Sequence, residues 1–277
     1  MKNLIKYAAV VLAIFGFASC DYIDEPLQDG GGNPVDTSKV FRNILIDDFT
    51  GHKCVNCPEA AEMIETMEAL PIFKGRIVSV ATHTGFFANV FAAPYQADYK
   101  TVDGEDLASV FGPSNFPIGM VNRIDFPNDH LKSYQSWPDV ANQFVSQETQ
   151  IDIVPLVNYN SADNTFVVDV DLEYKADLTG NDYKIVVMIT ESGIVSAQVS
   201  HSGDIPDYEH KHMLRGTTNT VIGESIGASG MALGDTEIYS TTGTLPTGSI
   251  AANSHLVVYV YDTATQEIMQ VEQIDIM

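Results

Sequence analysis

The sequence predicts an α/β domain followed by an all-β domain of the sandwich class. From Val40 to about Gln150, short apolar runs typical of strands alternate with segments of helical period. Beyond about Ile151 the helical period disappears, and strand-like segments are separated by turn-rich pieces. Alternating strands and helices indicate helices packed on a central sheet, whereas many strands without helices favour a β-sandwich.

The first domain is expected over residues 40–150. Its strands are expected at 43–49, 76–82 and 117–123, and its helices at 58–70, 104–111 and 137–147. The first helix is predicted because Ala60, Ile64 and Met67 recur at helical spacing, with glutamates on the other faces. Gly112 and Pro113 are expected to end the second helix.

The second domain is expected over residues 151–277. Phe166, Val168, Val170 and Leu172 alternate with polar residues, which predicts a strand with one buried and one solvated face. Further strands are expected at 183–190 and 256–261.

The N-terminus has the proportions of an export signal. Lys2 and Lys6 precede a short apolar stretch at 7–17, and small residues follow it directly before Cys20. This arrangement resembles the bacterial lipobox, which implies a signal peptide at 1–19, a lipid on Cys20 that anchors the chain to the membrane, and a flexible acidic tether at 20–39. An ordinary cleaved signal followed by a chance cysteine is the alternative. The expected location is the cell envelope, as an outer-membrane lipoprotein facing the periplasm or the cell surface.

The charge balance limits the class of partner. The chain has 14 Lys+Arg against 37 Asp+Glu, a net charge of -23. Such a surface repels phosphate backbones, so no nucleic-acid partner is expected.

Cys54 and Cys57 are the candidate reactive residues. They follow a predicted strand and begin a predicted helix, whose N-terminal N–H groups stabilise a thiolate. Cys54 is expected to be the more exposed, attacking thiolate, and Cys57 to resolve the mixed disulfide. A structural disulfide is one alternative. Zinc is another, but His52 and His83 would have to complete its four ligands, so no metal is expected.

Three other groups of side chains carry weaker signals. His210 and His212 share one face of a strand and can bind a metal, although a polar sheet face is the simpler interpretation. His83 ends the second strand, where it can border the reactive face. An aromatic insert is expected to serve as core or lid, with a peptide-binding wall as the alternative; its members are Phe86, Phe87, Phe91 and Tyr95.

The strand at 44–49, four further residues and the Cys-x-x-Cys pair resemble the thioredoxin-like superfamily, as does the loop at 111–118. The resemblance implies that Asp48 assists proton transfer to the resolving cysteine. It also implies that Pro117 is a cis-proline beside the pair, and that Phe116 and Pro117 help to bind an extended substrate segment. The expected fold is therefore an α/β thioredoxin-like domain followed by an immunoglobulin-like β-sandwich. Lys53 and the Val-Asn dipeptide between the cysteines depart from the superfamily's usual residues.

Three longer motifs resemble the outer membrane protein 28-related family, which consists of Gram-negative envelope lipoproteins. They are FTGHKCVNCP at 49–58, FPIGMVNR at 116–123 and EHKHMLR at 209–215. The expected function is thiol-disulfide exchange on exported proteins, with electrons from a partner dithiol and no dissociable cofactor. The alternative is a non-catalytic adhesion or binding lipoprotein in which the first domain is only a scaffold.

Overall fold

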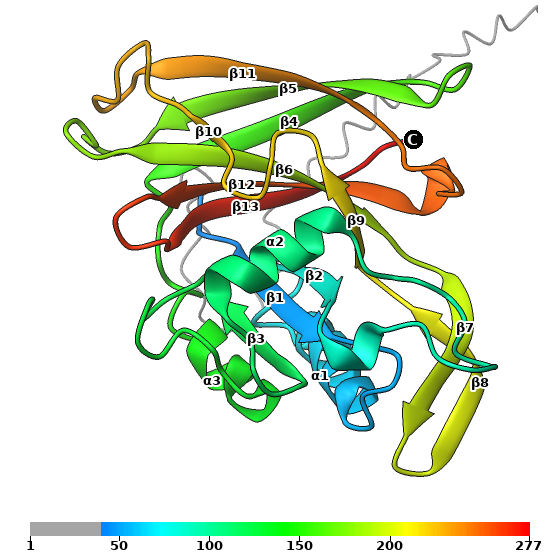
Figure 1. Ribbon diagram of the computed structural model, residues 1–277. Helices are drawn as coiled ribbons and strands as arrows, with labels where there is room; N and C mark the ends of the chain where they lie inside the picture. The colour runs from blue at the N-terminus through cyan, green and yellow to red at the C-terminus, as the bar shows by residue number, and fades with distance from the viewer. Residues whose placement is uncertain (1–39) are drawn as a thin grey trace, which may run out of the picture. The chain divides into compact units, whose positions relative to one another are not determined.

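A computed structural model describes residues 40–277 (Figure 1). The expected signal peptide, the tether and the lipidation site Cys20 lie outside the described residues. Within residues 40–277, no helix combines the length and the apolar character needed to cross a bilayer.

The elements follow in chain order. Up to Ala141 they are β1 (Ile44–Thr50), α1 (Cys57–Ala69), β2 (Ile77–His83), the 3-10 helix η1 (Phe86–Ala88), α2 (Val102–Phe111), β3 (Ile118–Val121), η2 (Tyr134–Ser136) and α3 (Trp137–Ala141). After that they are β4 (Ile151–Asn160), β5 (Thr165–Tyr174), β6 (Tyr183–Glu191), β7 (Ile194–Ser200), β8 (Gly203–His210), β9 (Met213–Thr217), β10 (Glu224–Ser225), β11 (Thr236–Thr244), η3 (Ala251–Asn253), β12 (Ser254–Asp262) and β13 (Ile268–Asp275).

The strands form three sheets. The largest has the order β13-β12-β6-β9-β2-β1-β3, with β10 paired to β6. A three-stranded sheet has the order β11-β5-β4, and β7 and β8 form a separate hairpin. β1 pairs with β2 in parallel and with β3 in antiparallel orientation.

The predicted α/β thioredoxin-like fold is wrong. The described chain is mostly β-structure, and β1, β2 and β3 have no sheet of their own. β2 pairs on its other side with β9, which links it to β6, β12 and β13 from far along the chain. Periodicity reports which face of a strand is buried, but not which distant strand lies beside it, so this shared sheet was not predicted.

Most of the local elements were nevertheless predicted correctly. The helices expected at 58–70 and 104–111 are α1 and α2, and the three strands expected in the first part are β1, β2 and β3. The helix expected at 137–147 is shorter, because α3 ends at Ala141. In the second part, β5, β6 and β12 match expected strands.

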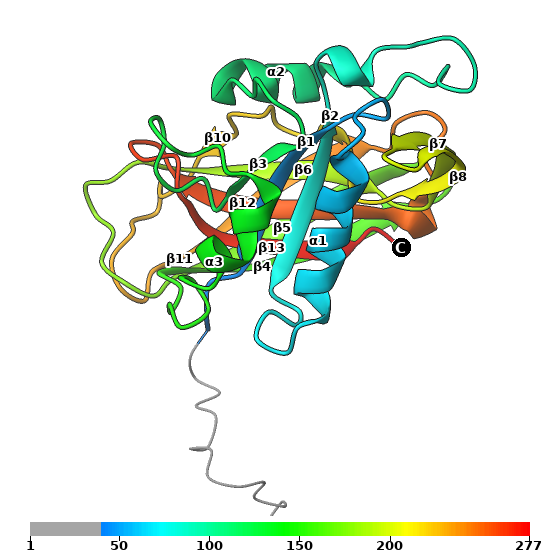
Figure 2. The same cartoon turned by 90° about the horizontal axis from the view of Figure 1, so that it is seen from below.

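β1 is buried on both faces along its whole length. Ile44 and Ile46 belong to a core under α1 and α3, whereas Leu45 and Phe49 belong to a second core with Phe111 of α2. Figure 2 shows α1 lying along β1 and β2. The helix buries Cys57, Ala60, Ile64 and Met67 against them, which matches the apolar spacing of its sequence.

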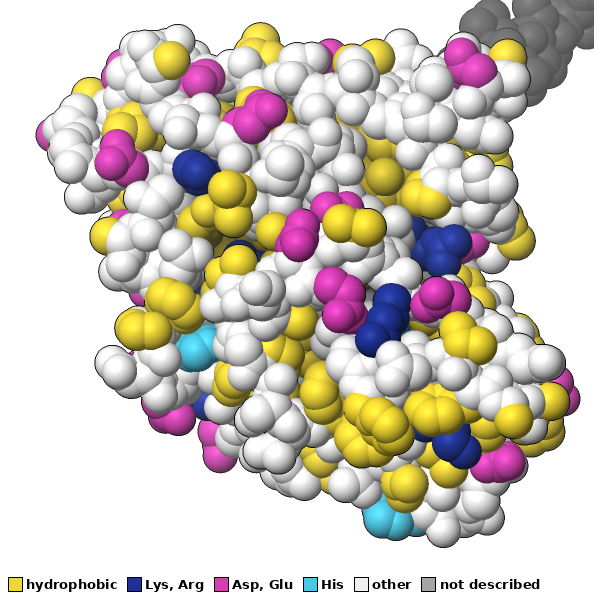
Figure 3. All heavy atoms as spheres, viewed as in Figure 1, with side chains coloured by type: hydrophobic (Ala, Val, Ile, Leu, Met, Phe, Trp, Pro, Cys, Tyr) yellow, Lys and Arg dark blue, Asp and Glu magenta, His cyan; other side chains and the backbone are white. Residues whose placement is uncertain are grey.

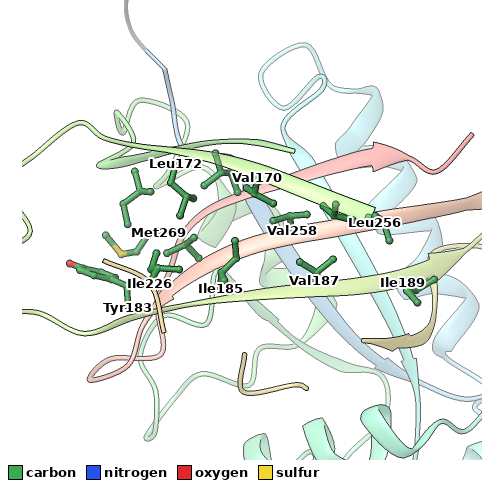
Figure 4. Packing of buried hydrophobic residues seen from close by; sticks show 14 of the residues in the cluster. Val170, Leu172, Tyr183, Ile185, Val187, Ile189, Ile226, Leu256, Val258 and Met269 are labelled. Carbon is green, nitrogen blue, oxygen red and sulfur yellow. The ribbon is translucent and has the colours of Figure 1, made fainter. Parts of the chain in front are cut away.

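A third core lies between the two larger sheets. The alternating apolar residues of β5 point toward those of β6 and β12, as Figure 4 shows. The even-numbered residues of β12, such as Val258, face this third core, while its odd-numbered residues, such as Tyr259, face the second one. β12 is therefore buried on both faces, like β1.

The large sheet curls until its far strand returns to β1 and β3. The Ile268 amide donates to the Asn122 carbonyl at 3.0 Å, and the Asn43 side chain donates to the Val271 carbonyl at 3.0 Å. The second core is thereby enclosed by strands from both parts of the chain.

A buried ion pair spans this second core. Arg123 Nε donates to Asp47 Oδ2 at 2.9 Å, and Arg123 Nη2 donates to the Tyr259 hydroxyl at 2.9 Å. Arg123 and Asp47 are each about 1% exposed. Burial alone lowers the pKa of Arg123, but Asp47 and Tyr259 raise it by more, so the guanidinium stays charged. The network ties β1 to β12 through a side chain that follows β3.

We expect the Asp47→Asn substitution to destabilise the protein by about 3–5 kcal/mol, because it leaves the Arg123 charge buried without a counterion. The urea unfolding midpoint, followed by circular dichroism, measures the change. The double variant Asp47→Leu/Arg123→Met should lose less than Asp47→Asn alone, because it removes both charges.

The matched control is Asp129→Asn. Asp129 pairs with Lys132 at 2.7 Å on the surface, where its side chain is 78% exposed, so the loss should stay below about 1 kcal/mol. Equal losses for Asp47→Asn and Asp129→Asn would contradict a structural role for the buried pair.

Candidate functional site

The two cysteines form a disulfide at the start of α1. Their Cα atoms are 5.3 Å apart, and Cys57 is the first residue of the helix. The Cys54 amide donates to the Gly51 carbonyl at 3.0 Å, which closes the turn before the helix. Cys54 is 2% exposed and Cys57 is 3% exposed. The expectation that Cys54 is clearly the more exposed cysteine is therefore wrong.

The turn is covered by two segments from elsewhere in the chain. From β7, the Gln198 side-chain amide donates to the Cys54 carbonyl at 3.0 Å, and the Val199 amide donates to the His52 carbonyl at 3.0 Å. From the segment between β2 and α2, the Phe87 carbonyl accepts from the Lys53 amide at 3.0 Å. These contacts satisfy the turn's backbone groups and bury both sulfur atoms.

Asp48 lies on the same face of β1 as α1. It is 3% exposed, and its Oδ1 atom has no hydrogen-bond partner. Burial raises the pKa of Asp48 to about 7. Asp47, one residue earlier, points to the opposite face and is held by Arg123. Of the two adjacent carboxylates, only Asp47 has a cation beside it.

Asp48 and Cys57 line one small pocket. Its volume is about 40 Å³, which is room for a few water molecules rather than a substrate. Several of its lining residues carry a buried polar atom without a hydrogen-bond partner; these are Asp48, Ser79, His83 and His212. Such a lining suits water molecules that carry protons between buried groups and solvent.

Histidines surround the far side of this pocket. The rings of His83 and His210 lie 5.5 Å apart, and Tyr99 contacts both. Burial, together with the neighbouring histidines, lowers the pKa of His83 well below its usual value. Burial is also the main cause that lowers the pKa of His210 to about 4. Both rings are therefore neutral at pH 7, because burial disfavours their protonated forms.

The structure brings together some of the predicted site residues and separates others. Asp48, Cys57 and His83 line the pocket, as do His210 and His212. Within residues 40–277, no group of three or more potential ligands is placed to hold a metal ion.

Phe116 and Pro117 are not among the residues that line this pocket. They precede β3, where Ile118 pairs with Phe49, so Pro117 comes beside the end of β1. The bond between them is cis, as expected. The Phe116 ring packs 6.1 Å from that of Phe87.

Sequence reasoning missed the residues that cover the site. Gln198, Ser196 and Tyr208 come from the β7–β8 hairpin, about 140 residues after the cysteines. Ser196 accepts a hydrogen bond from Tyr99 at 2.6 Å and lies 3.2 Å from His210 Nε2. No motif near these residues marks them, because their role depends on where the hairpin packs.

One comparison with known proteins identifies a family. The family model described as outer membrane protein Omp28 matches residues 105–277, which leaves the cysteine pair outside the matched region. A search of curated proteins finds no match.

Two solved structures from Porphyromonas gingivalis are similar to this chain. HBP35 has a TM-score of 0.69 at 14% identity, covering 85% of this chain and 76% of its own, which shows a similarity of fold alone. A domain of the outer membrane lipoprotein Omp28 is 22% identical, with a TM-score of 0.33, and the match covers 46% of this chain and 95% of that domain.

The raised pKa of Asp48 predicts a pH-dependent stability. Between about pH 4 and pH 7 an unfolded chain ionises this carboxyl while the folded protein keeps it protonated, so stability falls as pH rises. Replacing Asp48 with Asn removes this loss. We expect Asp48→Asn to be more stable than the parent protein by about 2–4 kcal/mol at pH 8, with little of that gain at pH 4.

Urea unfolding of the parent protein and the variant at both pH values measures the difference in unfolding free energy. Titratable groups that the two proteins share contribute equally to both and cancel in this difference. Asp169→Asn, at an exposed position on β5, is the control and should change little at either pH. A gain from Asp48→Asn that is the same at both pH values would mean that Asp48 is not buried in its protonated form.

Proposed function

Because the chain belongs to the Omp28 family of outer membrane proteins, which are proteins of the cell envelope, we propose that it acts there on exported proteins by thiol-disulfide exchange. The envelope is an oxidising compartment in which disulfides form and persist. Cys54 and Cys57 are the reacting residues in this proposal, and Asp48 serves as the proton donor and acceptor for Cys57.

The observation that carries the proposal is that Asp48 and Cys57, both buried residues, line the same pocket. A carboxyl group with a pKa of about 7 can gain or lose a proton near neutral pH, which suits a general acid-base group. The N-terminus of the 13-residue helix α1 adds support, because its free N–H groups stabilise a thiolate at the first turn.

The chemistry balances with a dithiol as the co-reactant. A thiolate of the partner attacks Cys54 Sγ, which forms a mixed disulfide and releases Cys57 as a thiolate. Asp48 gives its proton to Cys57. The partner's second thiolate then attacks the mixed disulfide, so that the partner leaves oxidised and the Cys54–Cys57 pair stays reduced. In the reverse direction, Asp48 takes the proton from Cys57 so that its thiolate can resolve a mixed disulfide with an exported client.

The burial of the pair favours a second candidate function. Two disulfide-bonded cysteines that are 2–3% exposed, under a hairpin hydrogen-bonded to their turn, also suit a structural cross-link. In that case the protein is a non-catalytic surface adhesion or binding lipoprotein, and its cysteines only staple the first turn of α1.

The reduction potential of the Cys54–Cys57 pair separates the two functions. We expect a value in the range of known exchange proteins, roughly -120 to -270 mV, measured by equilibration of the mature chain in glutathione or dithiothreitol buffers. A pair that stays oxidised well below about -300 mV would exclude the exchange reaction and leave the structural disulfide.

Single-cysteine variants test the assigned roles. Cys57→Ser should trap a mixed disulfide with a client through Cys54, whereas Cys54→Ser should trap much less, as non-reducing gels of envelope extracts would show. Equal trapping by both variants would contradict the assignment of Cys54 as the nucleophile.

A further inference from the structure

The segment between β2 and α2 differs in chemistry from the rest of this acidic protein. Residues 84–97 contain no Asp, Glu, Lys or Arg, although the chain as a whole has a net charge of -23. Residues 112–122, which lead into β3, contain none either. The two uncharged segments meet where the rings of Phe87 and Phe116 pack together.

Large apolar side chains from the first segment face the solvent. Phe86 is 66% exposed, whereas every other phenylalanine of residues 40–277 is buried or half-buried. Val90 is 54% exposed. The Phe86 ring lies 5.5 Å from that of Phe87 and 5.6 Å from that of Phe91, in edge-to-face contacts. Figure 3 shows hydrophobic side chains gathered on the molecule over this segment.

The segment is held in place by contacts beneath it. The Phe91 amide donates to the Tyr95 carbonyl at 2.8 Å, and Tyr95 is buried. Gly51 allows the closest approach, because a Cβ atom at this position would come within 2.6 Å of the Phe87 backbone. A surface fixed in this way loses little conformational entropy when it binds a partner.

The aromatic face, made of Phe86, Phe87, Val90, Phe91 and Phe116, is continuous with the turn that carries Cys54. The link is the hydrogen bond from the Lys53 amide to the Phe87 carbonyl, one residue before Cys54. A chain segment lying on the aromatic face is therefore next to the reactive turn.

We propose that the aromatic face binds an extended, uncharged apolar segment of the client protein and presents the client's cysteine to Cys54. This inference rests on the proposed exchange function and names its substrate class. An apolar client is favoured because both segments lack charge and the first exposes Phe86 and Val90, whose apolar surface leaves water when an apolar segment binds. Exported chains expose such segments before they fold, when their cysteines are still being paired.

Two peptides of equal length test the proposal. Each carries one cysteine as a mixed disulfide with glutathione; one has Phe, Leu and Val around it, and the other has Ser and Gln. We compare the parent protein with the double variant Phe86→Ser/Val90→Ser, whose exposed positions should leave the fold intact. Ile238→Ser is the matched control, because Ile238 is 70% exposed on β11, in the other sheet.

We expect the double variant to raise the KM for the apolar peptide about tenfold while kcat is retained. Its rates with the polar peptide and with dithiothreitol should not change, and Ile238→Ser should behave like the parent protein. Equal KM values for the two peptides, or a double variant that behaves like the parent, would overturn the proposal. So would a protein dimer that the double variant abolishes, because the aromatic face would then be a self-association surface.

Peptide binding to the oxidised protein tests the aromatic face separately from the proposed exchange reaction. Fluorescence anisotropy of labelled peptides, with serine in place of cysteine, needs no redox chemistry. Tighter binding of the apolar peptide that the double variant abolishes supports the aromatic face, even if exchange activity is absent and the proposed reaction fails. Exchange activity without any preference for the apolar peptide supports the reaction and overturns the aromatic face.

Discussion

The burial of two consecutive carboxylates in β1 is the constraint on which this structure depends. β1 has no solvent-facing side, so Asp47 and Asp48 point into opposite cores. A buried carboxylate must either have a cation beside it or take up a proton. Asp47 has Arg123, whose guanidinium also donates to the Tyr259 hydroxyl and thereby ties β1 to β12. The cation that pairs with the buried Asp47 carboxylate is therefore also the side chain that links β1 to β12 across the second core.

The other face of β1 leaves Asp48 without a cation, and that difference creates the chemistry of the candidate site. The strand sets Asp48 against α1, and the helix begins with the cysteine that shares its pocket. The histidines that complete the pocket are neutral, because burial disfavours their charged forms as it disfavours that of Asp48. Among these buried groups, Asp48 is the one whose pKa lies near neutral pH, whereas the charged residues of the lining, Glu65, Glu209 and Lys211, lie on the exposed side of the pocket.

Local features could be predicted from the sequence, and long-range pairings could not. The run at 44–49 and the spacing of Ala60, Ile64 and Met67 predicted β1 and α1, and hence the position of the Cys-x-x-Cys turn and of Asp48 beside it. β2 and β9 pair through one residue pair, Ala81 with Met213. No sequence pattern within either strand indicates this pairing. Through that pairing, β1, β2 and β3 join the strands of the second part in one sheet, which is why the predicted thioredoxin-like fold was wrong. The cover of the site was missed for the same reason, because the β7–β8 hairpin reaches it from the second part of the chain.

The β7–β8 hairpin, which covers the Cys54 turn, also limits the approach of a reactant to the disulfide. A thiolate must approach along the line of the two sulfur atoms, and neither sulfur is open to solvent in this arrangement. The hydrogen bonds from Gln198 and Val199 hold the β7–β8 hairpin to the turn, and each contributes only about 0.5–1.5 kcal/mol net. The hairpin forms its own two-stranded sheet, so it can separate from the turn without unpairing any strand of the large sheet. Tyr95 and Tyr99 also donate hydrogen bonds to Asp204 and Ser196 of the hairpin, so its displacement breaks these contacts as well. In the proposed reaction, this local step would give a client access to Cys54.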